Sequence, residues 1–237
     1  MRDDLSVKRA PVTRSHPMTQ SSPMTQPRLM RWLSIADVVC IPAIIILFIW
    51  RWQFTHRGIW IIFPVWIVAS FFIHRDTPKT LGWRADTLKR SAREAGIFFG
   101  MAIAILLVLA FARGMPKHLL WQAVAEHLWT YFAFCLLQQV ALNSFINNRL
   151  ISLIRKPWLS SLIAGLIFAS AHLPNPVLVP ITLVGGVAMA WLFRRNRNVL
   201  TLALGQALVG SMLAWAFPPV WIHNLRVGPG YFRWKPN

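Results

Sequence analysis

The polar side chains that could do chemistry within the apolar parts of this chain are four amides and one histidine. Gln138, Gln139 and Asn143 lie in one apolar segment, and a spacing of four residues puts Gln139 and Asn143 on the same face of a helix. His172 and Gln206 lie in two later apolar segments. Counted at 1.5 Å per residue from the nearest basic residue, Gln138, His172 and Gln206 lie about 16, 24 and 14 Å along their helices. Polar groups at such depths in a membrane helix are costly, so we expect them to converge on one polar site.

Seven apolar runs form the elements that must position these groups. They cover residues 33–50, 58–73, 96–112, 119–147, 158–172, 177–193 and 199–217. A helix of about 20 residues crosses a hydrocarbon core about 30 Å thick, and these runs approach that length. Because lipid offers no hydrogen bonds to the backbone, membrane segments of this kind form helices. The sequence therefore predicts an all-α, polytopic membrane helical bundle with about seven transmembrane helices.

The composition and the distribution of charge favour a membrane protein over a nucleic-acid-binding protein. Of all residues, 56% are hydrophobic and only 14% are charged, which is far from the balance of soluble proteins. The formal net charge is +18, but the basic residues sit at helix ends without forming one contiguous face, so we expect no nucleic-acid partner. Seven spans put 18 of the 25 Lys and Arg residues on one side, and loops rich in these residues stay in the cytoplasm. We therefore expect a multi-pass protein of the cell (inner) membrane, with a cytoplasmic N-terminus and an outside C-terminus.

This topology divides the chain into three regions. Residues 1–32 are rich in Pro, Ser, Thr and Gln and lack the apolar core of a signal peptide, so we expect a disordered basic cytoplasmic tail. Residues 33–217 form the transmembrane domain. Residues 218–237, rich in aromatic residues and glycine, form a short extracytoplasmic tail. The basic loop of residues 75–93 is expected either as a short amphipathic helix on the inner leaflet or as a solvated connection.

Three segments of the chain, Gln138 to Leu150, Phe168 to His172 and Gln206 to Gly210, stand in an order and at a spacing that resemble the motifs of the CAAX-protease and bacteriocin-processing (CPBP, or Abi) family of intramembrane proteases. The string QQVALNSFINNRL, which starts at Gln138, resembles the first motif, EExxxR. Phe168 to His172 matches the second motif, FxxxH, in full. Gln206 to Gly210 stands in the place of the third motif, HxxxN.

The resemblance implies an endopeptidase-like helical protein that handles membrane-bound or lipidated peptides, with membrane lipids and a membrane-anchored peptide as its partners. In that family the first-motif glutamate is taken to activate water, while the histidines support the water and the oxyanion. The residues at the family's catalytic positions are Gln138, Gln139, Asn143, His172 and Gln206, and those expected against the substrate are Phe168 and Gly210.

The first and third motifs are degenerate, because both glutamates, the arginine, and the third-motif histidine and asparagine are replaced. A glutamine amide keeps the shape of glutamate but accepts no proton near neutral pH, which excludes general-base catalysis at Gln138 or Gln139. We therefore expect a weak or inactive peptidase, and whether the chain is an enzyme stays open. A proteolytically silent membrane scaffold or binding protein is the alternative, and a small-solute transporter is a further one.

Other kinds of chemistry find less support in the sequence. A zinc site needs three or four His, Cys or carboxylate ligands, whereas the expected site offers His172 alone, so we expect no metal and no cofactor. Cys135 stands one turn from Gln138 and could pair with His172 as nucleophile and base, although an intramembrane cysteine is more often a packing residue. His172 could instead cap its helix before Pro174. We expect Asp37, near the start of the first run, at the membrane interface.

Overall fold

The computed structural model describes residues 28–114 and 121–235, and these residues form helices and turns without a strand. The longer helices are α1 (Arg28–Leu47), α3 (Ile62–Ile73), α5 (Leu88–Ala112), α6 (Trp121–Gln139), α8 (Pro157–Ser170), α9 (Leu178–Asn196) and α10 (Val199–Ala216). The shorter elements are η1 (Phe48–Trp52), α2 (Gln53–Thr55), η2 (Arg57–Ile61), α4 (Pro78–Leu81), η3 (Val140–Asn147), α7 (Asn148–Leu153), α11 (Pro219–Ile222), η4 (His223–Leu225) and α12 (Pro229–Arg233).

Each of the seven apolar runs forms a helix, which confirms the prediction of an all-α membrane bundle. Among the described residues, the segments long and apolar enough to cross a membrane are Arg28–Thr55, Leu88–Ala112, Leu178–Asn196 and Val199–Ala216, and the shorter apolar helices are Arg57–Ile73 and Pro157–Ser170. The first helix begins at Arg28, so residues 28–32 extend α1 instead of belonging to the tail. The rest of the expected disordered tail, residues 1–27, lies outside the described residues.

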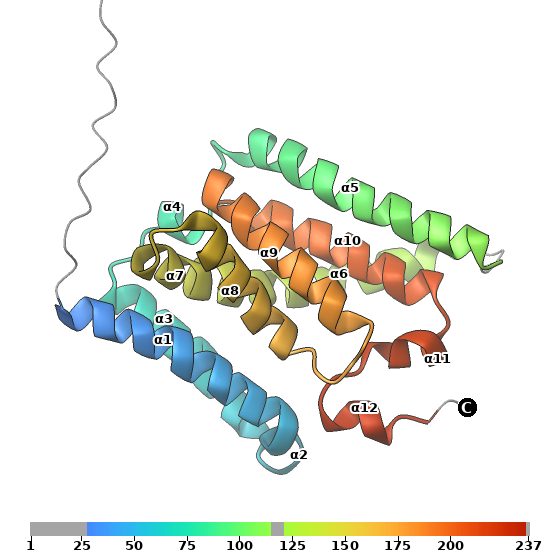
Figure 1. The fold of residues 1–237 in the computed structure, drawn as a ribbon, viewed down its shortest axis with the longest axis horizontal. Helices are drawn as coiled ribbons and strands as arrows, with labels where there is room; N and C mark the ends of the chain where they lie inside the picture. The colour runs from blue at the N-terminus through green and yellow to red at the C-terminus, as the bar shows by residue number, and fades with distance from the viewer. Residues whose placement is uncertain (1–27, 115–120, 236–237) are drawn as a thin grey trace, which may run out of the picture.

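The helix that carries the third motif, α10, packs against both α5 and α6, and α8 packs along α9 (Figure 1). The approach of α8 to α9 is close, since a Cβ at Gly186 would lie only 2.9 Å from the Cα of Gly165. α1 and α3 lie side by side along the edge of the bundle opposite α5 (Figure 1). Phe145, Phe193 and Leu202 are at most 1% exposed and belong to the core that the helices enclose.

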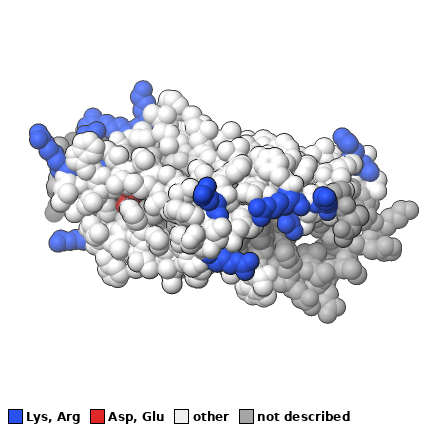
Figure 2. Space-filling model, turned by 90° about the horizontal axis from the view of Figure 1, so that it is seen from below, with Lys and Arg blue, Asp and Glu red and all other residues white. Residues whose placement is uncertain are grey.

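The outer surface has the character expected where helices face lipid. Figure 2 shows a largely uncharged face on which Lys and Arg side chains stand in separate groups, with one small acidic area. Large apolar side chains point outward on several helices, among them Phe72 and Phe111 at 79% exposure and Trp129 at 75%. Such extended apolar surface is stable against acyl chains and costly in water.

The short helix α4 and the turn after it are tied to the bundle through their backbone. The carbonyl oxygen of Thr80 accepts hydrogen bonds from the side chains of Asn148 (2.9 Å) and Arg197 (3.0 Å). Gly82 has a φ of +89°, and a Cβ there would lie 2.6 Å from the ring of Phe193, so this turn requires glycine. This part of residues 75–93 is therefore docked on the bundle, which differs from both arrangements expected from the sequence.

The C-terminal residues pack on the other end of the bundle. The side chain of Asn175 is fully buried, and its Nδ2 donates hydrogen bonds to the carbonyl oxygens of Ile222 (3.0 Å) and Arg226 (3.1 Å). The amide of Gly228 donates to the carbonyl oxygen of Leu173 at 2.7 Å. The expected short tail therefore forms a cap of α11, η4 and α12 on the turn between α8 and α9. This cap and the first residues of α1 lie at opposite ends of the bundle (Figure 1).

Candidate functional site

Side chains from three helices meet in a network of carboxamides. Gln139 at the end of α6 donates from Nε2 to Oε1 of Gln206 on α10 at 2.6 Å, and the same Nε2 lies 2.9 Å from the sulfur of Met189 on α9. The Oε1 of Gln139 accepts a hydrogen bond from Nδ2 of Asn143 at 2.6 Å. Gln206 in turn donates from Nε2 to Oε1 of Gln138. Three of the four expected amides are thus joined through Gln139 and the fourth through Gln206.

The network continues for one more turn than the sequence analysis foresaw. Asn147 donates from Nδ2 to Oδ1 of Asn143 (3.0 Å) and to the backbone carbonyl of Ala190 on α9 (3.0 Å). Gln139, Asn143 and Asn147 are all 0% exposed, so the network lies inside the bundle. We call the five residues of this network the amide cluster: Gln138, Gln139, Asn143, Asn147 and Gln206.

The local helix geometry arranges this cluster. α6 passes without interruption into the π-helical segment η3 and then into α7. A π-helical segment widens the helix and is frequent at functional sites. From the last residue of α6 to the last residue of η3, Gln139, Asn143 and Asn147 follow one another at a spacing of four, and each amide bonds to the next. Asn147 shares this spacing, so extending the pattern by one turn would have found it from the sequence.

His172 stands apart from the amide cluster. It lies just beyond the end of α8, and its Nδ1 is 2.8 Å from the carbonyl oxygen of Phe168, with the two ring centroids 4.8 Å apart. Over the part of the chain that the structure describes, no hydrogen bond links His172 to an amide of the cluster. The expected convergence of polar groups therefore holds for the amides, while the histidine makes a local contact within its own motif.

Gly210, expected against the substrate, contacts an aromatic residue. A Cβ at this position would lie 2.5 Å from both Cε1 and the hydroxyl oxygen of Tyr131 on α6. Tyr131 therefore occupies the space into which a larger residue at the third-motif position would extend. The sequence analysis did not single out Tyr131, since an aromatic residue in an apolar run carries no particular signal.

Among the described residues, the structure brings together neither the cysteine–histidine pair nor the metal ligands that the sequence analysis considered. Cys135 is fully buried in an apolar cluster with Ala203 and Ala207, and no contact brings its thiol to His172 within the described ranges. No group of three or more His, Cys, Asp or Glu residues that could hold a metal is found among the residues described. The donor set of the amide cluster, which consists of carboxamides, does not suit zinc either.

A second polar cluster, which the sequence analysis missed, joins the middle of α1 to the start of α7. Asp37 is 5% exposed, and its Oδ2 lies 3.2 Å from Nε of Arg149, which is 4% exposed. The same guanidinium donates to Asp76 at 2.7 Å and to the hydroxyl of Ser70 at 3.0 Å. Asp37 was expected at the membrane interface from its place in the sequence, and the structure adds that its carboxylate is buried against a cation 112 positions away. Arg149 follows the apolar run of residues 119–147 and was therefore among the 18 basic residues assigned to cytoplasmic loops, but it belongs to α7, which continues the helix of that run.

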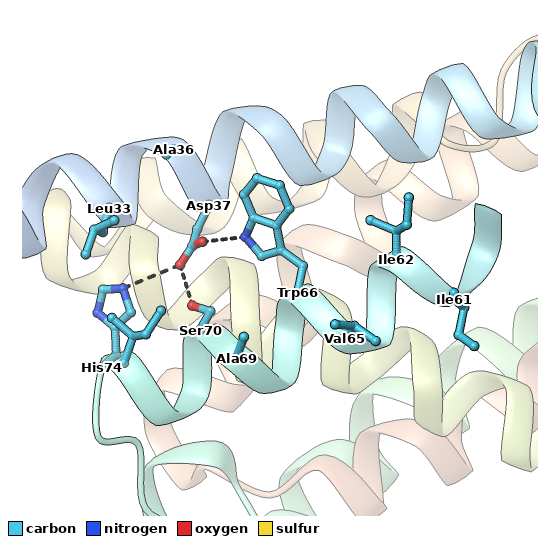
Figure 3. A pocket seen from close by; sticks show the side chains of 11 residues that line it. Leu33, Ala36, Asp37, Ile61, Ile62, Val65, Trp66, Ala69, Ser70 and His74 are labelled. Atoms are coloured by element: carbon cyan, nitrogen blue, oxygen red, sulfur yellow. Dashed lines mark hydrogen bonds and ion pairs between the residues drawn. The ribbon is translucent and has the colours of Figure 1, made fainter.

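Two further groups of α3 and of the turn after it complete this second cluster (Figure 3). Trp66 donates from Nε1 to Oδ1 of Asp37 at 3.0 Å, and Ser70 donates to Oδ2. The Nε2 of His74 lies 3.5 Å from the same Oδ2. Burial, with a smaller contribution from Arg149, lowers the pKa of His74 below its ordinary value of 6.5. The imidazole is therefore neutral at physiological pH.

The part of the chain that carries the amide cluster matches a known protein family. Residues 119–212 match the family model described as type II CAAX prenyl endopeptidase Rce1-like. This range contains all five amides, His172 and Gly210, and of the second polar cluster it contains Arg149 alone. Neither a curated protein nor a solved structure matches the chain.

Proposed function

Since residues 119–212 match the type II CAAX prenyl endopeptidase Rce1-like family model, we propose that this chain is a proteolytically silent relative of that family that binds membrane-tethered or lipidated peptides between its helices. The binding region comprises the amide cluster together with Phe168, His172 and Gly210. The partner is a peptide held at the membrane by a lipid or by its own apolar segment.

The main support for the proposal is that the side chain of Gln139 is buried and fully hydrogen-bonded to other amides. Its amide nitrogen donates to Gln206, its amide oxygen accepts from Asn143, and its side chain is fully buried. A carboxamide cannot take a proton from water near neutral pH, and here both of its ends are already engaged with other carboxamides. Loss of a general base typically costs about 10² to 10⁴-fold in rate. An uncharged, hydrogen-bonded network suits a structural or recognition role better than activation of water.

His172 is the member of the site best suited to contact a peptide. Because its Nδ1 faces the carbonyl of Phe168, the proton of the neutral ring belongs on Nδ1 and Nε2 is an acceptor. A peptide bond presents an N–H donor of the kind that such an acceptor binds. The half-buried ring stands beside the turn that the C-terminal cap covers, so peptide would approach from that end of the bundle.

The orientation of the protein in the membrane forms part of the proposal. We place the N-terminus in the cytoplasm and the C-terminal cap outside, in the cell (inner) membrane, because 17 Lys and Arg residues besides the buried Arg149 then lie on the cytoplasmic side, against 7 on the other. Reporter fusions before Arg28 and after Asn237 test this orientation. Two reporters on the same side of the membrane would contradict it.

The test of the proposed function compares binding and cleavage in the same preparation. The full chain in liposomes is incubated with membrane-tethered peptides, with and without a prenyl group, and products are followed by mass spectrometry while binding is followed by photo-crosslinking. We expect saturable crosslinking without turnover. His172→Ala should weaken the crosslinking, whereas the exposed His56→Ala serves as a matched control without effect. Turnover that His172→Ala abolishes would establish a hydrolase instead, and solute flux without peptide binding would establish a transporter.

A further inference from the structure

A group of basic side chains lies at the end of the bundle opposite the C-terminal cap. Because the cap covers the turn between α8 and α9, the start of α8 and the end of α9 meet at this opposite end (Figure 1). Arg194 stands in the last turn of α9, while Arg155 and Lys156 directly precede α8. The two helices pack along each other, so three cationic residues gather at their junction.

The guanidinium of Arg194 is half-buried and contacts the first turn of α8. Its Nη1 donates a hydrogen bond at 2.9 Å to Oγ of Ser160, a fully buried residue whose own hydroxyl donates to the carbonyl oxygen of Pro157. Within the described ranges the side chain of Arg194 makes no other hydrogen bond and no ion pair. A guanidinium has five N–H donors, so most of the donors of Arg194 remain available to a ligand.

A second guanidinium, that of Arg197 directly after α9, lies close to Arg194. Burial, followed by the positive charges of Arg194 and Arg84, lowers the pKa of Arg197 below its ordinary value, while Asp76 opposes this effect. The Nη1 of Arg197 donates to two neutral oxygen atoms, at 3.0 and 2.8 Å. Because like charges close together repel each other, an anion bound beside Arg194 would relieve this repulsion.

Each carboxylate near this group already pairs with an arginine. The pairs are Asp37 and Asp76 with Arg149, Asp86 with Arg84, and Glu94 with Arg195. The carboxyl end of α9 adds about half a negative charge from its backbone dipole, which offsets only part of the charge of Arg194 and Arg197. Arg155 and Lys156 are exposed, and neither pairs with a carboxylate in the part of the chain that the structure describes. Positive charge therefore remains uncompensated around Arg194.

Aromatic side chains place this group at the level of lipid headgroups. Trp158 in the first turn of α8 is 58% exposed, and Trp191, which stands one turn before Arg194 on the same side of α9, is 43% exposed. Tryptophan is enriched where membrane helices meet water. An anion at Arg194 would therefore have an apolar surface beside it, which suits a phospholipid with its acyl chains better than a free phosphate ion.

We propose that Arg194, together with Arg155 and Lys156, binds the phosphate of an anionic phospholipid. The guanidinium donates its free N–H groups to the phosphate oxygens, a geometry for which its planar fork is well suited. The two exposed cations attract the net negative charge of the lipid, and its acyl chains lie along Trp191. The site uses no residue of the amide cluster, so it is independent of peptide recognition there.

The test measures lipid binding to the full chain in detergent micelles by native mass spectrometry. Phosphatidylglycerol is compared with phosphatidylcholine of the same acyl chains, since both carry a phosphate but only phosphatidylglycerol has a net negative charge. We expect the first phosphatidylglycerol to bind at least about tenfold more tightly, the combined effect of roughly two cations on one net charge. Millimolar inorganic phosphate should not displace it. Displacement would assign the site to a free anion and overturn the lipid proposal.

Two variants act on different parts of the site. Arg194→Gln removes the half-buried cation and should weaken phosphatidylglycerol binding about tenfold, while phosphatidylcholine binding stays unchanged. Lys156→Gln changes an exposed side chain and should weaken phosphatidylglycerol binding about fivefold, so it tests the site even if Arg194→Gln fails to fold. The matched control is Arg93→Gln, because Arg93 is an exposed cation at the same end of the bundle, on α5.

Two results would contradict the site. Equal binding of the two lipids to the unmodified chain would overturn the proposal. An equal loss of phosphatidylglycerol binding in Arg93→Gln and Arg194→Gln would also overturn it, since the protein would then respond to net charge alone.

Discussion

The guanidinium of Arg149 lies 3.2 Å from the carboxylate of Asp37, and the side chains of the two residues are 4% and 7% exposed. This ion pair connects α7 to α1, while Asp76 holds the same guanidinium from the turn after α3. Since α7 continues the helix that carries the amide cluster, the pair fixes the first two membrane helices against the part of the bundle that contains the candidate site.

Removal of one partner of this pair should destabilise the protein strongly. Asp37→Leu leaves the buried guanidinium with Asp76 as its remaining carboxylate, and loss of a buried partner typically costs about 3 to 5 kcal/mol. The double variant Asp37→Leu with Arg149→Met should lose less than the sum of the two single changes. Denaturant unfolding in detergent micelles measures all three. Additive losses would mean that the two residues do not interact, and Arg84→Met, at an exposed pair with Asp86, serves as the control with little effect.

The helical character of the seven apolar runs could be predicted because it depends on a local property, the length and composition of each run, although only four helices of the described residues are long and apolar enough to cross a membrane. The amides of the cluster could also be singled out, since a polar group in such a run is rare and their spacing of four is visible along the chain. The partner of Gln139 on α10 and the partner of Asp37 on α7 depend on how helices distant in sequence pack, which periodicity does not encode. The charge count treated Arg149 as a loop residue for the same reason.

The contact between Gly210 and Tyr131 illustrates a second limit of prediction from the sequence, which concerns side-chain packing. The sequence shows that a small residue stands at the third-motif position, but not which side chain fills the vacated space. The same holds for the C-terminal residues, where aromatic composition suggested an interfacial tail. The buried amide of Asn175 instead draws the backbone of Ile222 and Arg226 onto the bundle.

Stability should depend on pH through His74. Burial lowers the pKa of this histidine in the folded protein, whereas in the unfolded chain it has its ordinary value of 6.5. The unfolded state therefore binds the proton more readily, so the free energy of unfolding is at its full value above about pH 6.5 and falls as the pH decreases below it. The slope for one proton is at most about 1.4 kcal/mol per pH unit.

This pH effect belongs to the second polar cluster as a whole, because Arg149 also lowers the pKa of His74 while Asp37 and Asp76 raise it. Unfolding of the wild type and of His74→Phe should be compared between pH 5 and 8. The variant should lose part of the decline below pH 6.5. An identical decline in both proteins would show that His74 does not contribute to it.

The amide cluster should stabilise the bundle even if it performs no catalysis. Gln206→Leu removes the acceptor of Gln139 and the donor to Gln138 in one step. A buried polar group left without its partner costs about 1 to 3 kcal/mol, and a loss of this size is expected in detergent unfolding. Gln53→Leu is the control, since within the part of the chain that the structure describes the side chain of Gln53 bonds to the backbone of its own helical segment alone. An unchanged stability of Gln206→Leu would mean that the amides are not paired as described.

Restoring the third-motif asparagine at position 210 should conflict with Tyr131. In Gly210→Asn the new Cβ would lie 2.5 Å from the Tyr131 ring and hydroxyl, and both groups sit on packed helices with little freedom to move apart. Overpacking of this kind typically costs about 1 to 3 kcal/mol. Tyr131→Ala opens the space, so the double variant Gly210→Asn with Tyr131→Ala should be more stable than the sum of the two single losses predicts. A double-mutant cycle by detergent unfolding measures this coupling. Strict additivity would place Tyr131 away from position 210, and a harmless Gly210→Asn would show that the helices can separate to admit the family's residue.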